Sequence, residues 1–220
     1  DVLSFSTNTE PMLDLPYWTF HLRREDPIWE TTADRGGVLT IGGLHEATVE
    51  ENYTWVPVTR YFFPNTTALE ASAPLPFYWA VPAKLNVWFD GGTTNVFRET
   101  RPGNDASKVR NYSFPSAVID SGTSGLVLPA NVVEAIADVW GLTNFVSSVN
   151  GFSYFDCPSS EDTLRMMIEF TIGGESIYLS GYDDLLTRIS STRCSAQVYA
   201  QGGQVILGAS FFRANHAIAF

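Results

Sequence analysis

Short apolar runs separated by glycine and polar turns dominate the chain. Runs rich in branched and aromatic residues are typical of β-strands. They occur at residues 37–43, 55–58, 78–81, 85–89, 117–119, 166–172, 177–179, 205–207 and 217–220. Two glycine-containing turns, Asp90-Gly91-Gly92 and Gly173-Gly174, predict hairpins after the runs 85–89 and 166–172. The pattern therefore predicts an all-β chain.

Helical spacing is rare. The best example is residues 130–140, where apolar side chains recur with the period of a helix and Gly141 is placed to end it. A second short helical turn is predicted near Tyr182–Leu186. Residues 63–76 and 98–111 are polar and predict exposed loops. Because the sequence contains no repeat and no linker, we expect residues 1–220 to form one all-β domain with one or two short helices.

One polar segment directly follows an apolar strand, and it is the main candidate for chemistry. Residues 118–125 read VIDSGTSG, so the strand delivers Asp120 onto a turn of glycine and hydroxyl residues. The tripeptide alone is also ordinary composition for a β-turn. An aspartate in this position needs hydrogen-bond donors. The backbone beside the small Gly122 and the Ser121 hydroxyl can supply them.

The order of residues in this segment resembles the second active-site motif of pepsin-like aspartic proteases. Other segments of the chain match that family in order and spacing. They are Gly37–Gly43, Trp55–Val58, Tyr78-Trp79, the helix after the motif, the pair Cys157 and Cys194, and residues 205–213. The resemblance covers nearly all of residues 15–220. It implies a C-terminal lobe of a bilobal protease, with a closed, orthogonal, barrel-like sheet and a ψ-shaped loop beside the aspartate.

The resemblance also implies roles for individual residues. Asp120 is the catalytic carboxylate, and Ser121, Gly122 and Thr123 support it, with Thr123 reaching from across the lobe interface. Gly122 and Ser124 are expected to hold an extended substrate by strand-like hydrogen bonds. Tyr78 is expected to line a pocket on the primed side of the substrate.

The chemistry of such an enzyme requires a second aspartate. Two neighbouring carboxylates share one proton and serve as acid and base, a coupling for which this family is the standard example. No second Asp-[Ser/Thr]-Gly occurs in this chain, and Asp90-Gly91-Gly92 lacks the hydroxyl residue. We therefore expect an aspartic endopeptidase when a missing N-terminal lobe is present, and no appreciable activity from the 220 residues alone. Residues 1–14 match the segment between lobes poorly, and the last strand of the family is expected to be missing after Phe220.

Cys157 and Cys194 are the only cysteines. A bridge between them would stabilise the fold by roughly 3–4 kcal/mol, whereas the alternative is two buried thiols. Three glycosylation sequons begin at Asn52, Asn65 and Asn111. They favour the secretory pathway, from which a bridge follows, and we expect a secreted or vacuolar (lysosomal) protein.

Composition narrows the partners. With 24 acidic and 13 basic residues, the net charge of −11 makes nucleic acid a poor partner. No apolar run approaches the roughly 18 residues of a membrane span. No cluster of residues has metal-ligand spacing, and neither a metal nor another cofactor is expected. The expected partner is a peptide or protein substrate.

Two other functions are alternatives to the protease. A serine hydrolase would need Gly-x-Ser-x-Gly, but the sequence 122–126 ends in Leu126, and His21, His45 and His216 are scattered. The more serious alternative is a non-catalytic protein of the same fold that acts as a binding module or inhibitor. The intact Asp120 argues against it.

Overall fold

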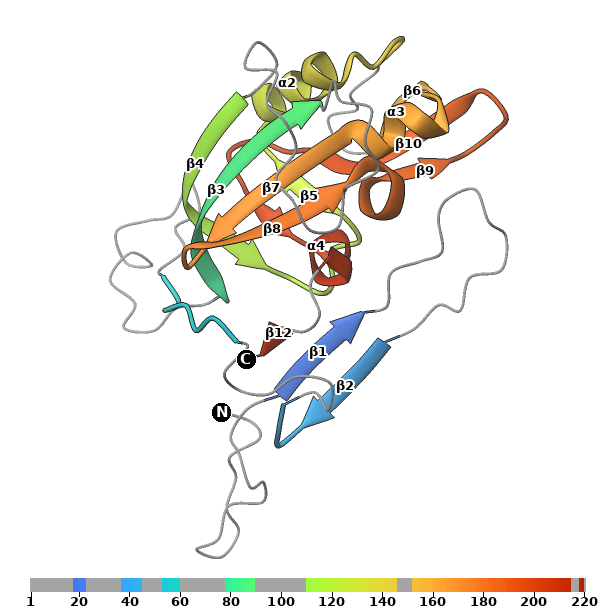
Figure 1. The fold of residues 1–220 in the computed structure, drawn as a ribbon. Helices are drawn as coiled ribbons and strands as arrows, with labels where there is room; N and C mark the ends of the chain where they lie inside the picture. Colours follow the sequence, from blue (N-terminus) through green and yellow to red (C-terminus); the bar gives the residue numbers. More distant parts are fainter. Residues whose placement is uncertain are drawn as a thin grey trace, which may run out of the picture.

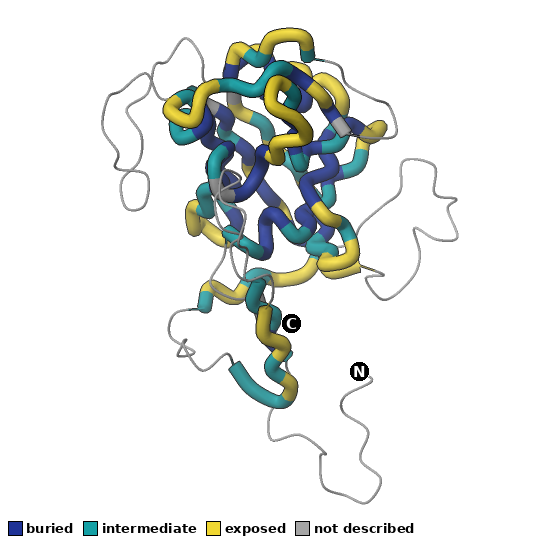
Figure 2. Tube along the Cα trace, turned by 90° about the vertical axis from the view of Figure 1, so that its right-hand side faces the viewer, coloured by how far each residue is buried: buried dark blue, intermediate teal, exposed yellow. Residues whose placement is uncertain are grey.

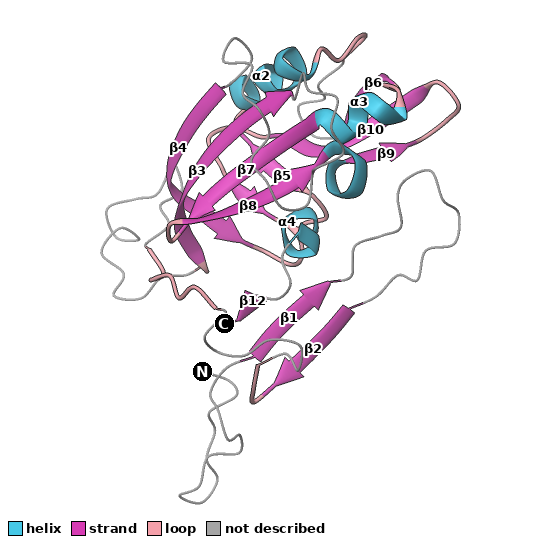
Figure 3. Cartoon of the chain, in the orientation of Figure 1, coloured by secondary structure: helices cyan, strands magenta, loops and turns pink. Residues whose placement is uncertain are grey.

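Two β-sheets make up most of the chain in a computed structural model. It describes residues 18–22, 37–44, 53–59, 78–89, 110–145, 152–214 and 218–219. The larger sheet has nine strands and the smaller has three (Figure 1). Figure 3 shows that strands predominate and that the helices are short. The described chain is therefore mostly β, as predicted.

An antiparallel run of four strands, in the order β4-β3-β7-β8, forms one half of the larger sheet. These strands are β3 (Ala80–Phe89), β4 (Arg110–Ile119), β7 (Met166–Ile172) and β8 (Glu175–Ser180). Gly173 and Gly174 join β7 to β8 with φ of 62° and 93°. Two consecutive positive φ values suit the twist of a tight hairpin and favour glycine. The predicted hairpin is thus confirmed.

The other half of the larger sheet contains the strand pairings that position the candidate site. Its strands are β5 (Leu126–Leu128), β6 (Phe152–Asp156), β9 (Leu186–Arg188), β10 (Arg193–Ala200) and β11 (Ile206–Leu207). The short β11 lies between β4, to which it is parallel, and β5, to which it is antiparallel. β5 in turn runs parallel to β10. The strand β11, which comes late in the chain, thereby lies between β4 and β5, which come much earlier.

The helix predicted at 130–140 is confirmed as α2 (Ala130–Trp140), and Gly141 ends it with φ of 64°. Two further helices were not predicted: α3 (Ser160–Arg165) and α4 (Ala209–Ala214). The helical turn expected near 182–186 is a π-helical turn, Gly181–Leu185. The described residues thus contain more helices than the one or two expected. The sequence did not predict α3 and α4 because each is too short to show a helical period.

Side chains of the larger sheet and of α2 form most of the hydrophobic core. Figure 2 shows the buried residues in dark blue. Side chains alternate along the strands, so that Leu85, Val87, Ile168 and Phe170 are fully buried. From α2, the buried side chains include those of Val132, Val133, Ile136 and Trp140. Burying one side chain of this size contributes about 1.5–3 kcal/mol. Packing of this core fixes the strands that carry the site.

The smaller sheet has the order β12-β1-β2, formed by β1 (Trp18–Leu22), β2 (Gly37–Ile41) and β12 (Ile218–Ala219). It contacts the larger body through α4, where the rings of Phe20 and Phe212 meet edge to face with centroids 5.5 Å apart. Val38, Leu39 and Ile41 of β2 are exposed. Of the predicted strands at 37–43 and 217–220, the structure shows residues 37–41 and 218–219 as strands.

Several expectations need correction. The closed barrel is not found: within the described residues the larger sheet is open, with β6 and β8 at its ends. At the end of β8, the Asp184 carboxylate accepts a hydrogen bond from the Ser180 N–H at 3.0 Å. Residues 80–89 form one strand, β3, which contains the end of the predicted run 78–81 and the whole of the run 85–89. Its register shifts between Val81 and Ala83, because the intervening proline has no N–H.

Residues 55–58 form no strand. Trp55 and Val58 are exposed, and a Cβ added at Gly173 would lie 2.6 Å from a methyl carbon of Val56, so this segment packs on the β7–β8 turn. The predicted turn at 90–92 and the loop at 63–76 lie outside the described residues. Of the loop expected at 98–111, only 110 and 111 are described, and both belong to β4.

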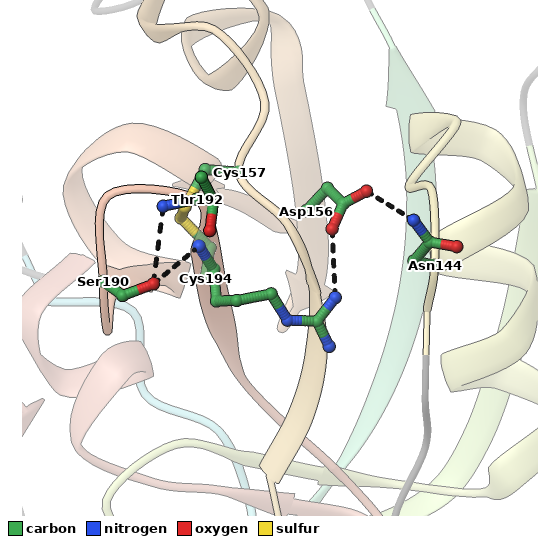
Figure 4. A network of polar contacts seen from close by, with 7 residues as sticks. Asn144, Asp156, Cys157, Ser190, Thr192 and Cys194 are labelled. Carbon is green, nitrogen blue, oxygen red and sulfur yellow. Dashed lines mark hydrogen bonds and ion pairs between the residues drawn. A yellow bond between two sulfur atoms is a disulfide. The ribbon is translucent and has the colours of Figure 1, made fainter.

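A disulfide joins Cys157, just after β6, to Cys194 in β10, which confirms the bridge rather than two thiols. Figure 4 shows Asp156 beside this bridge, bonded to Asn144. The Arg193 guanidinium also donates to Asp156, at 3.0 Å. Asn144 first and Arg193 second hold the pKa of Asp156 below its ordinary value. Together these contacts fix the loop after α2 to the β6–β10 pair.

Candidate active site

Asp120 stands at the point where β4 ends and β11 lies alongside. The N–H of Val118 donates to the carbonyl oxygen of Val205 at 2.9 Å, and the N–H of Asp120 donates to Leu207 at 3.1 Å. On the opposite side, the N–H of Ile119 donates to the carbonyl oxygen of Trp79 at 2.7 Å. The backbone before Asp120 is therefore held from both sides. The strand β11 lies between β4, to which it is parallel, and β5, to which it is antiparallel, and the Asp120 loop joins these two outer strands.

Both oxygens of the Asp120 carboxylate accept hydrogen bonds from its own loop. The N–H of Gly122 donates to Oδ1 at 2.9 Å, and the Thr123 hydroxyl donates to Oδ2 at 2.7 Å. These donors are neutral, and the side chain of Asp120 stays half-buried. Hydrogen bonds to a carboxylate are stronger than bonds between neutral groups. The loop therefore presents one oriented carboxylate at the surface.

Ser121 and Thr123, the two hydroxyl residues expected to support Asp120, lie differently on its loop. The Thr123 hydroxyl donates to Asp120 Oδ2 within the loop, and its expected contact across a lobe interface stays a prediction. The Ser121 side chain is exposed, and among the described residues it makes no hydrogen bond to Asp120. The N–H of Gly122 can approach Asp120 Oδ1 closely because residue 122 has no side chain. A Cβ there would lie 3.1 Å from Oδ1 of Asp120, tighter than most real contacts.

Two glycines let the loop approach β10 and the turn after β11. A Cβ on Gly208 would meet the carbonyl oxygens of Thr123 and Gly125, and one on Gly125 would meet the carbonyl oxygen of Gln197. These close approaches accompany backbone hydrogen bonds. The N–H of Gly208 donates to Gly125 at 3.0 Å, and the N–H of Ala209 donates to Thr123 at 2.7 Å. The glycines are thus required by packing around the Asp120 loop.

The residues expected to bind substrate lie on two neighbouring elements. Gly122 and Ser124 belong to the Asp120 loop and are exposed. Tyr78 is 41% exposed and precedes Trp79, whose carbonyl is bonded to Ile119. The structure therefore brings Asp120, Gly122, Thr123 and Ser124 together, with Tyr78 on the segment that leads into β3.

The family model described as eukaryotic aspartyl protease matches residues 10–220. The chain belongs to this family. This aspartyl protease chain has the fold of the aspartic proteinase from Irpex lacteus, whose crystal structure matches with a TM-score of 0.56 and 14% identity. The match covers 94% of the chain and 56% of the Irpex protein. A comparison with curated protein sequences finds no match.

The described part of this aspartyl protease chain holds no group of three or more residues suited to a metal ion. It also contains no helix that is long and apolar enough to cross a membrane. His21 lies in β1, whereas His45 and His216 fall outside the described residues. The oriented groups at the site are thus a carboxylate, hydroxyls and backbone amides.

Residues of β10 that sequence reasoning missed also reach the Asp120 loop. The Ser124 hydroxyl and the Tyr199 hydroxyl are 2.8 Å apart, and Tyr199 donates to Oε1 of Gln197 at 2.7 Å. The only sequence signal was the alternation along 193–200, in which Gln197 and Tyr199 share a face. The contact of Tyr199 with Ser124 depends on the parallel register of β5 and β10.

Proposed function

We propose that this chain supplies one of the two catalytic carboxylates of an aspartic endopeptidase, and that Asp120 is that group. The observation that carries the proposal is the Asp120 loop at the end of β4. Both carboxylate oxygens are bonded there by the loop, and β11 fixes the backbone beneath them. The Gly122 bond is that of an ordinary Asx-turn, so the support for the proposal comes from the Thr123 hydroxyl on the second carboxylate oxygen and from the backbone bonds to β11 and Trp79.

The reaction is the hydrolysis of a peptide bond by a water molecule. One carboxylate must be ionised to take a proton from the water, and the other must be protonated to polarise the peptide carbonyl. One aspartate cannot do both at once. The second is proposed to come from another lobe that carries its own Asp-[Ser/Thr]-Gly, with residues 1–220 acting as the C-terminal lobe.

The substrate is proposed to be an extended peptide that lies across the Asp120 loop. The N–H and carbonyl groups of its backbone would bond to Gly122 and Ser124, as in the addition of a strand to a sheet edge. Tyr78 is proposed to contact side chains on the far side of the scissile bond. No cofactor takes part in this scheme.

A secretory location is part of the proposal. The Cys157–Cys194 bridge favours an oxidising compartment, and the sequons at Asn52, Asn65 and Asn111 favour passage through the secretory pathway. A secreted or vacuolar (lysosomal) protease is the form that fits both features.

The test uses the protein made from its full-length gene, with Asp120→Asn as the matched variant. We expect the wild type to cleave a denatured protein at acidic pH and to bind a statine-type mimic of the transition state. Asp120→Asn should lose cleavage and keep the same melting temperature. Residues 1–220 on their own should show no cleavage that depends on Asp120, so the wild-type fragment and its Asp120→Asn variant should give the same result.

Two outcomes would overturn the assignment. Full activity at neutral pH without response to the statine-type mimic would exclude the aspartic mechanism. A protein that binds peptide without cleaving it, equally well with Asp120 or Asn at position 120, would be a binding module or inhibitor.

A further inference from the structure

A chain of hydrogen-bonded side chains leads from the Asp120 loop onto β10 and β9. The hydroxyls of Ser124 and Tyr199 lie 2.8 Å apart, and Tyr199 donates to Gln197 Oε1 at 2.7 Å. The Gln197 amide then donates to the Thr187 hydroxyl at 3.3 Å. Ser124 and Thr187 are exposed, whereas Gln197 and Tyr199 are half-buried. The chain therefore begins at the site and continues along the surface of the sheet.

The direction of these bonds fixes what Ser124 can do. A tyrosine hydroxyl has one proton, and that of Tyr199 goes to Gln197 Oε1, which only accepts. In the pair with Tyr199, Ser124 must then be the donor. Its single proton is committed, and the described residues make no use of its acceptor capacity. Ser124 is thereby left as an acceptor toward any molecule on the Asp120 loop.

The backbone of the same segment also fixes the exit of the Asp120 loop. A Cβ on Gly125 would meet the Gln197 carbonyl oxygen and would lie 3.0 Å from the Cε2 atom of Tyr199. Gly125 is buried, and its neighbour Leu126 pairs with Val198 in register. Tyr199 thus contacts the loop through its ring as well as its hydroxyl, so its position is rigidly tied to that of Ser124.

We propose that Tyr199 and Gln197 are positioning residues that hold Ser124 as a hydrogen-bond acceptor for a main-chain N–H of a peptide substrate. This inference rests on the proposed protease function and deepens it. Under this proposal, Tyr199 and Gln197 of β10 determine that Ser124 accepts, rather than donates, one hydrogen bond with the substrate backbone. Tyr199 touches neither the scissile bond nor the water, so its removal should weaken peptide binding without slowing the chemical step.

The test uses the full-length protein and a series of peptides in which each main-chain N–H is replaced in turn by N-methyl. On the wild type, one N-methyl position away from the scissile bond should raise KM by about 2- to 10-fold, the loss of one hydrogen bond. In Tyr199→Phe, KM for the unmodified peptide should rise by a similar factor, and that N-methyl group should have little further effect. In both comparisons kcat should stay within about twofold.

Matched variants separate polarity from packing. Gln197→Glu keeps the acceptor and should behave as the wild type, whereas Gln197→Leu should resemble Tyr199→Phe. Ser124→Ala should also remove the sensitivity to that N-methyl position. Tyr154→Phe changes an exposed tyrosine of β6 and should alter neither KM nor the N-methyl pattern.

The same series can be measured as peptide binding to the Asp120→Asn protein by calorimetry, which needs no catalysis. If the wild type cleaves nothing while this binding pattern persists, the protease function fails and the positioning role stands. The positioning role is overturned if Tyr199→Phe keeps the wild-type sensitivity to N-methylation. It is also overturned if no peptide binds, or if Tyr199→Phe lowers kcat equally for every peptide.

Discussion

The N–H of Asp120 donates to the carbonyl oxygen of Leu207 at 3.1 Å, which joins the end of β4 to the end of β11. The next residue after Leu207 is Gly208, and its own N–H donates to Gly125. The loop that carries the carboxylate is thus enclosed between a strand and a glycine turn from late in the chain. This relationship explains why the site depends on residues that lie nowhere near it in the sequence.

Gly208→Ala is expected to destabilise the protein by at least about 2 kcal/mol. Its Cβ would meet the carbonyl oxygens of Thr123 and Gly125, and main-chain atoms cannot move aside without shifting the Asp120 loop. Urea unfolding of the two proteins measures the difference.

Gly202→Ala is the matched control, because a Cβ there would have no atom within 4 Å. Its stability should stay within about 1 kcal/mol of the wild type. Equal stability of the Gly208 and Gly202 variants would refute the packing argument.

Thr123→Val is expected to lower kcat of the complete enzyme by about 10- to 100-fold. The change keeps the shape of the side chain but removes the hydroxyl that donates to Asp120 Oδ2 at 2.7 Å, a bond to a charged group worth about 1.5–3 kcal/mol. Steady-state kinetics at acidic pH provide the measurement. Thr123→Ser restores the donor and should recover most of the activity. If Ser and Val behave alike, the hydroxyl does not support the carboxylate.

The elements that could be predicted from the sequence are those with enough residues to show a period or a turn. The 11 residues of α2 repeat the apolar pattern three times, and Gly173-Gly174 marks the β7–β8 hairpin. Helices α3 and α4 have six residues each, fewer than two turns, so their pattern carries no period. The first half of β4 alternates exposed Asn111 and Ser113 with half-buried Tyr112, a strand signal that its polar residues concealed.

The residues of the candidate site also differ in whether the sequence could predict them. Asp120, Gly122 and Thr123 could be found because they are contiguous and resemble a family motif. The bond from Thr123 to Asp120 Oδ2 was not predicted, because the sequence alone does not say whether a hydroxyl reaches a group within its own loop or one across an interface. Tyr199 and Gln197 were missed because their contact with the loop follows from strand register, which a single sequence does not encode locally.

The Cys157–Cys194 bridge is expected to stabilise the fold by about 3–4 kcal/mol. It closes a loop of 37 positions and restricts the unfolded chain. Replacing both cysteines by alanine should lower the free energy of unfolding by that amount, measured by urea denaturation. Intact mass after alkylation, with and without prior reduction, checks the bridge itself. Alkylation of both thiols without reduction would contradict it.

Asn111 is expected to carry an N-glycan when the protein passes through a eukaryotic secretory pathway. The side chains of Asn111 and Ser113 are both exposed on β4, so a glycan would fit the folded chain. Enzymatic deglycosylation should shift the mass of the peptide that contains Asn111. Ser113→Ala keeps the asparagine and removes the sequon, and it should abolish that shift. An unmodified Asn111 peptide in the wild type would contradict the prediction. Asn52 and Asn65, the asparagines of the other two sequons, lie outside the described residues.

Asp156 is expected to make the stability of the protein depend on pH in the acidic range. Asn144 first and the Arg193 guanidinium second lower the pKa of Asp156 from its ordinary value of 3.8. A carboxyl group with a lowered pKa in the folded state stabilises the fold above its ordinary pKa. That contribution is lost as the pH falls through the folded-state pKa. The melting temperature of the wild type should therefore exceed that of Asp156→Asn near pH 5, and the difference should shrink below about pH 3.8.

Added salt and matched variants test the origin of this pH dependence. The side chains of Arg193 and Asp156 are 37% and 44% exposed, so salt should reduce the part due to their charges and leave the Asn144 hydrogen bond. Arg193→Met should remove part of the difference between the wild type and Asp156→Asn. Glu134→Gln, which removes an exposed carboxylate from α2, corrects for the change in net charge. A difference between the wild type and Asp156→Asn that is constant from pH 5 to below pH 3 would show that Asp156 acts by packing rather than by its charge.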